Sequence, residues 1–128
     1  MGQKVLAIDY GTKRIGLAIS DETQTLAREL NILNPSEFWK KIADLITEYE
    51  IELIVLGWPV GMKGQITNKT KEVSQFADQL QELIDCPIKF LDERLTSKLA
   101  AEIAGTEHQI DSLSAQILLQ NYLDNKKV

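Results

Sequence analysis

Two short, uninterrupted apolar runs near the start of the chain, residues 5–8 and 15–19, constrain the fold most strongly. Runs of this length without alternating polar residues are typical of strands that are buried on both faces of a sheet. Only Asp9 and the five residues from Tyr10 to Arg14 separate the two runs, and Gly11 lies among those five. Because so short a connection joins antiparallel strands, the runs predict a hairpin at the centre of a sheet.

The rest of the chain predicts further strands separated by amphipathic helices. A third strand is expected within residues 26–33, where Leu26, Leu30 and Ile32 alternate with polar residues. Apolar runs at 53–56 and 88–91 predict two more strands, and residues 58–67 predict a loop. Helices are expected after caps at Asn34 and Asn68, the second ending before Pro87, then over 96–104 and from Asp111 onward. This order predicts an α/β fold, with a mixed five-stranded sheet (three antiparallel leading strands and two further parallel strands) and helices on both faces.

Length and composition narrow the class of protein. A chain of 128 residues is long enough for one domain, taken here as residues 1–128. No apolar run reaches the roughly 18–20 residues of a membrane span, the first strand begins too early for a signal peptide, and a single cysteine fits a reducing cytoplasm. The 14 basic and 19 acidic residues give a net charge of −5, which argues against a large, non-specific nucleic-acid binder.

Acidic side chains lie at three separate places that the predicted topology brings to one edge of the sheet. Asp9 ends the first strand, Asp92 and Glu93 follow the last strand, and Asp111 opens the last helix. The carboxyl ends of the strands of such a sheet are where ligands gather. Local roles are the alternatives: Asp9 as a turn cap, Asp111 as a helix cap, and residues 92–94 as a solvated loop.

Three carboxylates at one sheet edge form an oxygen-only site of the kind that Mg²⁺ or Mn²⁺ prefers. Two such ions about 4 Å apart would activate a water and stabilise the leaving oxygen in phosphodiester hydrolysis. The glycines of the first turn and of residues 57–64 would let a phosphate approach the backbone closely. The expected substrate-binding residues are Gly11, Thr12, Lys13, Arg14, Gly57, Pro59, Gly64, Lys63 and Arg94, with Lys69, Lys71 and Lys98 as further basic residues at the same end.

Four segments, in order and spacing, resemble the YqgF/RuvX family of Holliday junction resolvase-like proteins, also described as nucleases that mature the small-subunit (16S) ribosomal RNA precursor. They are DYGTKRIGLA at 9–18, LGWP at 56–59 with Gly64, DERLT at 92–96, and ID at 110–111 with SA at 114–115 and IL at 117–118. The resemblance implies a ribonuclease H-like fold and a metal-dependent nuclease. By position, the resemblance implies that Asp9 corresponds to the family's acidic residue on the first strand and Asp111 to its acidic residue on the last helix. The middle acidic residue corresponds to Glu93, with Asp92 beside it, and the choice between these two is left open.

One departure from the family pattern is the lack of Lys or Arg in residues 101–110, where relatives usually carry a basic residue before the last acid. The favoured substrate is structured RNA, including ribosomal precursor particles, and the alternative is branched DNA. The oligomeric state, monomer or homodimer, is left open. A non-catalytic ribosome-assembly or nucleic-acid-binding factor is a second interpretation. A third is a phosphate-binding half of an ATPase of the sugar kinase and actin class, which needs a second domain. Cys86 is expected to be structural, and His108 to have no catalytic role.

Overall fold

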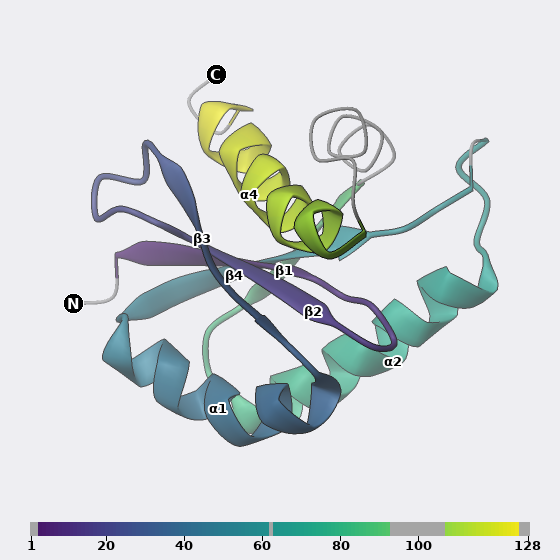
Figure 1. Ribbon diagram of the computed structural model, residues 1–128, viewed down its shortest axis with the longest axis horizontal. Coiled ribbons are helices and arrows are strands. Elements are labelled where there is room, and N and C mark those ends of the chain that lie inside the picture. Colours follow the sequence, from purple (N-terminus) through teal and green to yellow (C-terminus); the bar gives the residue numbers. More distant parts are fainter. Residues whose placement is uncertain (1–2, 62, 93–106, 126–128) are drawn as a thin grey trace.

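In the computed structural model of the protein, residues 3–61, 63–92 and 107–125 are described, with 107–113 described by their backbone alone. Five strands form one sheet in the order β3-β2-β1-β4-β5 (Figure 1). The strands β1–β3 are antiparallel neighbours, and β4 and β5 run parallel to β1. The mixed sheet predicted from the apolar runs is therefore confirmed. The strand bounds are β1 Lys4–Asp9, β2 Ile15–Ser20, β3 Ala27–Leu33, β4 Ile51–Trp58 and β5 Ile88–Asp92.

Helices cover both faces of the sheet, as the sequence predicts. The helices α1 (Pro35–Glu48) and α2 (Asn68–Leu83) lie against one face, and α4 (Glu107–Asn125) crosses the other (Figure 1). At the start of α1, the Asn34 side chain accepts a hydrogen bond from the Glu37 amide, and the Glu37 side chain accepts one from the Asn34 amide. This capping box is the start signal that the sequence carries. No helix within the described part of the chain is long and apolar enough to cross a membrane.

The sheet separates two apolar clusters, which we name after the helices that cover them. In the α1–α2 core, Phe38, Ile42, Val73, Phe76 and Leu80 pack on the strand residues Leu6, Ile8, Leu17, Ile54 and Leu56. In the α4 core, Ala115, Leu118, Leu119 and Leu123 pack on Val5, Ala7, Ala18 and Val55. Alanines on both sides let α4 approach the sheet closely, and each fully buried leucine contributes roughly 1.5–3 kcal/mol. Strand residues of opposite parity therefore belong to different cores.

The third strand lies within residues 26–33, as predicted: it begins at Ala27, where pairing with β2 starts, and Leu26 before it is 65 % exposed. Two other predicted boundaries are wrong. Trp58 was expected in a loop but ends β4, where pairing with β5 extends the strand. Thr67 is the cap of α2 in place of Asn68, since its hydroxyl accepts a hydrogen bond from the Thr70 amide.

The last helix also differs from the prediction. It begins at Glu107, so Asp111 lies within the helix and is not its N-cap. The helix predicted over 96–104 lies outside the described residues, as does any test of its cap. Pro87 comes after α2 as expected, although the helix already ends at Leu83.

Candidate active site

Asp9 is the last residue of β1 and lies at the sheet edge where the parallel strands end. It pairs with Gly16 of the antiparallel neighbour β2 and is half-buried. Because side chains alternate along a strand, Asp9 belongs to the same face as Val5 and Ala7, which is the face that α4 covers. On β4 the corresponding position is taken by Gly57, which follows the Ile8–Leu56 pair and adds no side chain beside the carboxylate. The structure thus places Asp9 where the sequence predicts.

The backbone of α4 brings position 111 to the level of Asp9. Farther along the helix, the Gln120 side chain accepts a hydrogen bond of 2.9 Å from the Ala27 amide, and Ala27 pairs with Ser20 at the opposite end of the sheet. Position 111 is nine residues before Gln120, or about 13.5 Å along the helix axis at 1.5 Å per residue. Four residues of β1 cover about 13 Å from Val5, next to Ser20, to Asp9. The backbone at position 111 of α4 therefore lies at the same end of the sheet as Asp9, on the side that α4 covers.

Asp92 lies on the other face of the sheet. Ile88 packs on the α1–α2 core and Leu91 on the α4 core, so Asp92 follows Leu91 onto the α1–α2 side. It is exposed and pairs with Trp58 in register. The structure does not bring Asp92 to the face of Asp9. Glu93 and Arg94, which follow it, lie outside the described residues.

The turn between β1 and β2 is tight and anchored at both ends. A Cβ atom at Gly11 would lie 2.6 Å from the Arg14 carbonyl oxygen, so the turn itself requires glycine there. The Tyr10 ring packs against Phe76 of α2, with 4.6 Å between ring centroids. Thr12 and Lys13 are exposed and Arg14 is half-buried. The sequence suggested that Gly11 leaves room for a phosphate to approach the backbone. In the structure, the Arg14 carbonyl oxygen takes the space beside the Gly11 Cα atom.

The segment between β4 and α2 uses its own backbone amides. The Gly61 amide donates to the Gln65 carbonyl (2.8 Å), the Gly64 amide to the Gly61 carbonyl (2.8 Å), and the Lys63 amide to the Gln65 side chain (2.9 Å). Gly64 has a φ of 82°, which glycine adopts without strain. These three amides are therefore engaged within the loop and are not free to bind a phosphate.

Basic side chains of this segment and of the first turn of α2 are exposed to solvent. Lys63, Lys69 and Lys71 are all exposed. The Thr70 hydroxyl donates a hydrogen bond to the Pro59 carbonyl and ties the loop to the first turn of α2. The spacing of Thr67 and Thr70 is a capping signal in the sequence, but the hydrogen bond from Thr70 to Pro59 becomes evident only in the structure.

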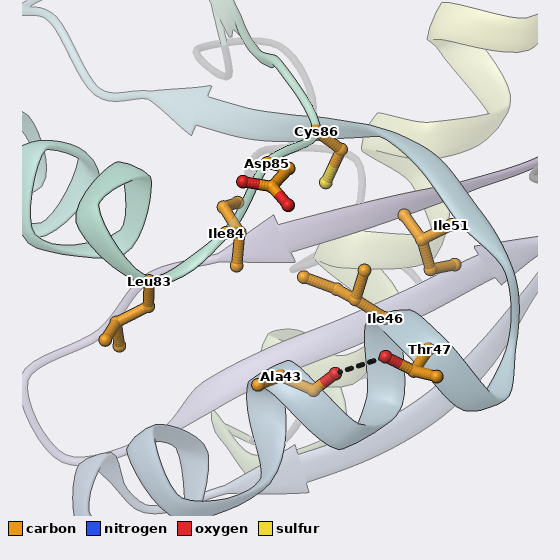
Figure 2. A pocket seen from close by; sticks show the side chains of 8 residues that line it. All are labelled: Ala43, Ile46, Thr47, Ile51, Leu83, Ile84, Asp85 and Cys86. Atoms are coloured by element: carbon orange, nitrogen blue, oxygen red, sulfur yellow. Dashed lines mark hydrogen bonds between the residues drawn. The ribbon is translucent and has the colours of Figure 1, made fainter.

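The pocket in Figure 2 lies at the opposite end of the sheet, near the start of β4. Its volume is about 410 Å³, and its lining residues are Ala43, Ile46, Thr47, Ile51, Leu83, Ile84, Asp85 and Cys86. The Thr47 hydroxyl donates to the Ala43 carbonyl (3.2 Å), so it is already used within α1. Burial raises the pKa of the Cys86 thiol, which leaves it protonated and weakly nucleophilic. This pocket has none of the predicted site residues.

Among the side chains that the structure describes, no group of three His, Cys, Asp or Glu residues is placed to hold a metal ion. Two of the three predicted ligands, Glu93 and Asp111, do not belong to that set. The donor types still fit a hard cation, because Asp9, Glu93 and Asp111 offer carboxylate oxygens only.

Comparison with known proteins decides the family. Residues 3–125 match the family described as "RuvX: Holliday junction resolvase". The chain belongs to the RuvX family. The match includes all four segments on which the resemblance was based, and the expected family is confirmed.

Relatives of this RuvX chain have nearly its own length. A Roseiflexus protein named "Putative pre-16S rRNA nuclease" is 38 % identical, over 97 % of this chain and 96 % of its own. A Dictyoglomus turgidum protein of the same name is 37 % identical, over 95 % and 94 %. Thermus thermophilus RuvC, solved with a Holliday junction substrate, superposes with a TM-score of 0.56 over 91 % of both chains. At 14 % identity, this last likeness shows the fold alone and confirms the ribonuclease H-like architecture.

Proposed function

We propose that this RuvX chain is a divalent-metal-dependent nuclease, and that its favoured substrate is the 5′ end of the small-subunit ribosomal RNA precursor. The observation that supports this most is the placement of Asp9, a half-buried carboxylate at the end of β1, on the face where α4 begins. Family membership and the names of the relatives point to the same activity. Fold alone does not decide function, so the proposal depends on the residues at this edge.

The proposed metal ligands for Mg²⁺ or Mn²⁺ are Asp9, Glu93 and Asp111. Helical spacing supports Asp111, because position 111 falls on the same stripe of α4 as Ala115 and Leu118, which pack on the sheet. Asp92 is a weaker candidate than Glu93, since it lies on the opposite face from Asp9. When bound, two such ions would supply an activated water and stabilise the leaving oxygen of a phosphodiester.

Basic side chains at the same edge would bind the phosphates of the substrate. Lys13 and Arg14 flank the turn after Asp9, Lys63 lies in the loop after β4, and Arg94 follows β5 in sequence. The net charge of −5 limits non-specific attraction, so few phosphate contacts are expected. Replacing Lys13 by Ala should lower the slope of log affinity against log salt by about one.

Cleavage assays with Mg²⁺ or Mn²⁺ test the proposal on precursor 16S rRNA and on a four-way DNA junction. Asp9→Asn should reduce cleavage to background while the fold is kept. Asp78→Asn, a matched change at an exposed site on α2, should cleave like the wild type. Equal cleavage by wild type and Asp9→Asn would refute the catalytic role.

Two experimental outcomes would favour a different function for this protein. Junction cleavage with a dimeric solution mass would favour a Holliday junction resolvase, because symmetric cleavage needs two sites related by a two-fold axis. If Asp9→Asn restored growth in cells lacking the protein, a non-catalytic assembly factor would be favoured. The lack of Lys and Arg in residues 101–110 is the feature that speaks for the latter.

A further inference from the structure

Two glutamine side chains of α4 bind the backbone at the start of the edge strand β3. The Gln120 side-chain oxygen accepts a hydrogen bond from the Ala27 amide (2.9 Å), and its side-chain nitrogen donates to the Thr25 carbonyl (2.9 Å). One helical turn earlier, the Gln116 side chain donates to the Ala27 carbonyl (3.3 Å). We call these three hydrogen bonds the glutamine clamp. They join α4 to a segment that lies 89 to 95 positions earlier in the chain.

The strand register explains why these backbone groups are open to α4. Ala27 pairs with Ser20 of β2, and the backbone hydrogen bond beside this pair runs from the Asp21 amide to the Leu26 carbonyl. In an antiparallel ladder this pattern marks a non-hydrogen-bonded pair, so the amide and carbonyl of Ala27 point away from β2. They lie on the outer edge of β3, the first strand in the sheet order. The glutamine clamp therefore takes the place of a neighbouring strand.

The amide group of Gln120 is fully used, which fixes its orientation. Its nitrogen also donates to the Asp124 carboxylate (3.0 Å), so both of its N–H donors and its oxygen have partners. On the opposite flank of the helix, the Lys89 ammonium of β5 lies 5.2 Å from the centre of the Tyr122 ring. Since β3 and β5 are the two edge strands, polar contacts tie α4 to both edges of the sheet.

Apolar packing alone would not define where α4 lies along the sheet. Small side chains meet at this interface, Ala115 on the helix and Ala7 and Ala18 on the strands, and they leave a smooth contact surface. Burial of apolar area is non-directional, whereas a hydrogen bond needs its donor and acceptor about 2.7–3.2 Å apart and well aligned. A slide of α4 by one residue would move both glutamines by about 1.5 Å and break the clamp.

The position of the clamp is coupled to that of residue 111 through the helix itself. The backbone of α4 is one continuous helix from Glu107 to Asn125, so a shift at Gln120 is carried along it to position 111. A rotation of about 10° moves an atom on the helix surface, about 5–6 Å from the axis, by about 1 Å. The groups of a metal site must be held within about 0.5 Å of their productive positions. A small error at the clamp would therefore exceed what the proposed site tolerates.

We propose that Gln120, with Gln116, is a positioning residue: the glutamine clamp sets the axial position and the rotation of α4 and thereby the place of Asp111 relative to Asp9. The inference rests on the proposed nuclease function for its meaning in catalysis. The clamp itself needs no metal ion and no substrate, so its effect on α4 can be measured without either.

Nuclear magnetic resonance in EDTA tests the clamp in the full chain. Gln120→Met keeps the length and helix propensity of the side chain but removes its hydrogen bonds. Hydrogen exchange of the Ala27 amide should become faster by about 5-fold or more, the factor that corresponds to one hydrogen bond. The ¹⁵N–¹H resonances of Asp9 and Gly16 should also move, although Gly16 lies four residues, or about 13 Å, along β2 from Ser20, the partner of Ala27.

Titration calorimetry with Mn²⁺ measures the consequence for the proposed metal site without hydrolysis. Gln120→Met should weaken Mn²⁺ binding by about 10-fold, the lower end of the range for groups that orient metal ligands. Gln116→Met removes a single, longer hydrogen bond and should have a smaller effect.

Two control variants separate positioning from a general loss of stability. Leu123→Val trims a buried leucine of α4 three residues beyond Gln120, and it should lower Tm while the Mn²⁺ affinity and the Asp9 resonance stay unchanged. Gln79→Met makes the same replacement at an exposed glutamine of α2 and should change none of these quantities.

The outcomes separate this inference from the nuclease function. Unchanged Asp9 resonances and Mn²⁺ affinity in Gln120→Met would overturn the proposal even if the Ala27 amide exchanges faster, because the clamp would then stabilise β3 alone. Equal changes in Leu123→Val and Gln120→Met would overturn it as well, since lost stability would explain both. If the wild type binds no Mn²⁺, the nuclease proposal fails, whereas movement of the Asp9 resonance in Gln120→Met alone would still establish that the clamp sets the position of α4.

Discussion

Replacing Gly11 by alanine should destabilise the whole hairpin on which Asp9 is placed. The added Cβ would lie 2.6 Å from the Arg14 carbonyl oxygen, 0.8 Å short of the 3.4 Å at which ordinary contact begins. That oxygen belongs to the backbone and cannot rotate away as a side chain would. The chain on either side is also held, because Tyr10 packs on Phe76 and Ile15 is fully buried. The strain must therefore spread into the β1–β2 pair.

The size of the effect follows from these contacts. Forcing one extra carbon into a packed site costs about 1–3 kcal/mol. An unfolding entropy of about 2.1 cal/mol/K per residue gives about 0.27 kcal/mol/K for 128 residues, so Tm should fall by about 4–11 °C. Thermal unfolding followed by circular dichroism or calorimetry, with EDTA present, measures this change without a contribution from bound metal.

Gly61→Ala is the matched control. Its Cβ would meet an even closer neighbour, at 2.2 Å, but that neighbour is the exposed and flexible Gln65 side chain, which can move. Neither glycine has a positive φ, so backbone strain does not distinguish them. We expect Gly61→Ala to lower Tm by less than half as much as Gly11→Ala. Equal melting temperatures for the two variants would refute the steric argument for the turn.

Three further predictions concern stability and reactivity. Ser20→Ala should lower the free energy of unfolding, measured in urea, by about 1–3 kcal/mol. The buried Val5 amide donates to the Ser20 hydroxyl over 2.8 Å and would lose this acceptor. An unchanged free energy of unfolding would contradict this prediction. Hydrogen bonds from the Thr23 hydroxyl and from backbone amides lower the pKa of Asp21 to about 2, so its contribution to stability is present above pH 4 and lost as the pH falls through 2. Asp21→Asn should therefore flatten the stability profile between pH 4 and 2, whereas an unchanged profile would exclude the linkage. Burial raises the pKa of Cys86, so iodoacetamide should alkylate the folded chain at pH 8 more slowly than the urea-unfolded chain, and equal rates would count against burial of the thiol.

Local sequence signals predict the elements and their order. The runs at 5–8 and 15–19 become the central strands β1 and β2, and Asn34 with Glu37 marks the start of α1. These signals succeed because burial of an apolar run and capping of a helix depend on residues that are close in the chain. The mixed topology follows from the lengths of the connections, since short turns give antiparallel strands and helical crossovers give parallel ones.

The order of strands and helices also predicts that Asp9 lies at the carboxyl edge of the sheet. It does not determine on which face of the sheet each nearby acidic side chain lies. The sequence offers both Asp92 and Glu93 as the middle acid and favours Glu93 only weakly. The packing of Ile88 and Leu91 into opposite cores shows that Asp92 lies on the face away from Asp9. A strand turns its side chains alternately to two faces, and which face meets which helix depends on contacts between segments far apart in the chain.

Tertiary contacts likewise decide the roles of the glycines and aromatic residues. The sequence determined that Gly11 lies in a turn, whereas the fold put the Arg14 carbonyl against it, where a phosphate was expected. Trp58 and Phe90 are 32 positions apart in the sequence and become neighbours only through the register of β4 and β5. Pattern along the chain thus determined the elements of this RuvX protein, while register and packing between distant segments decided which side chains meet at its edge, because those contacts exist only once the sheet has formed.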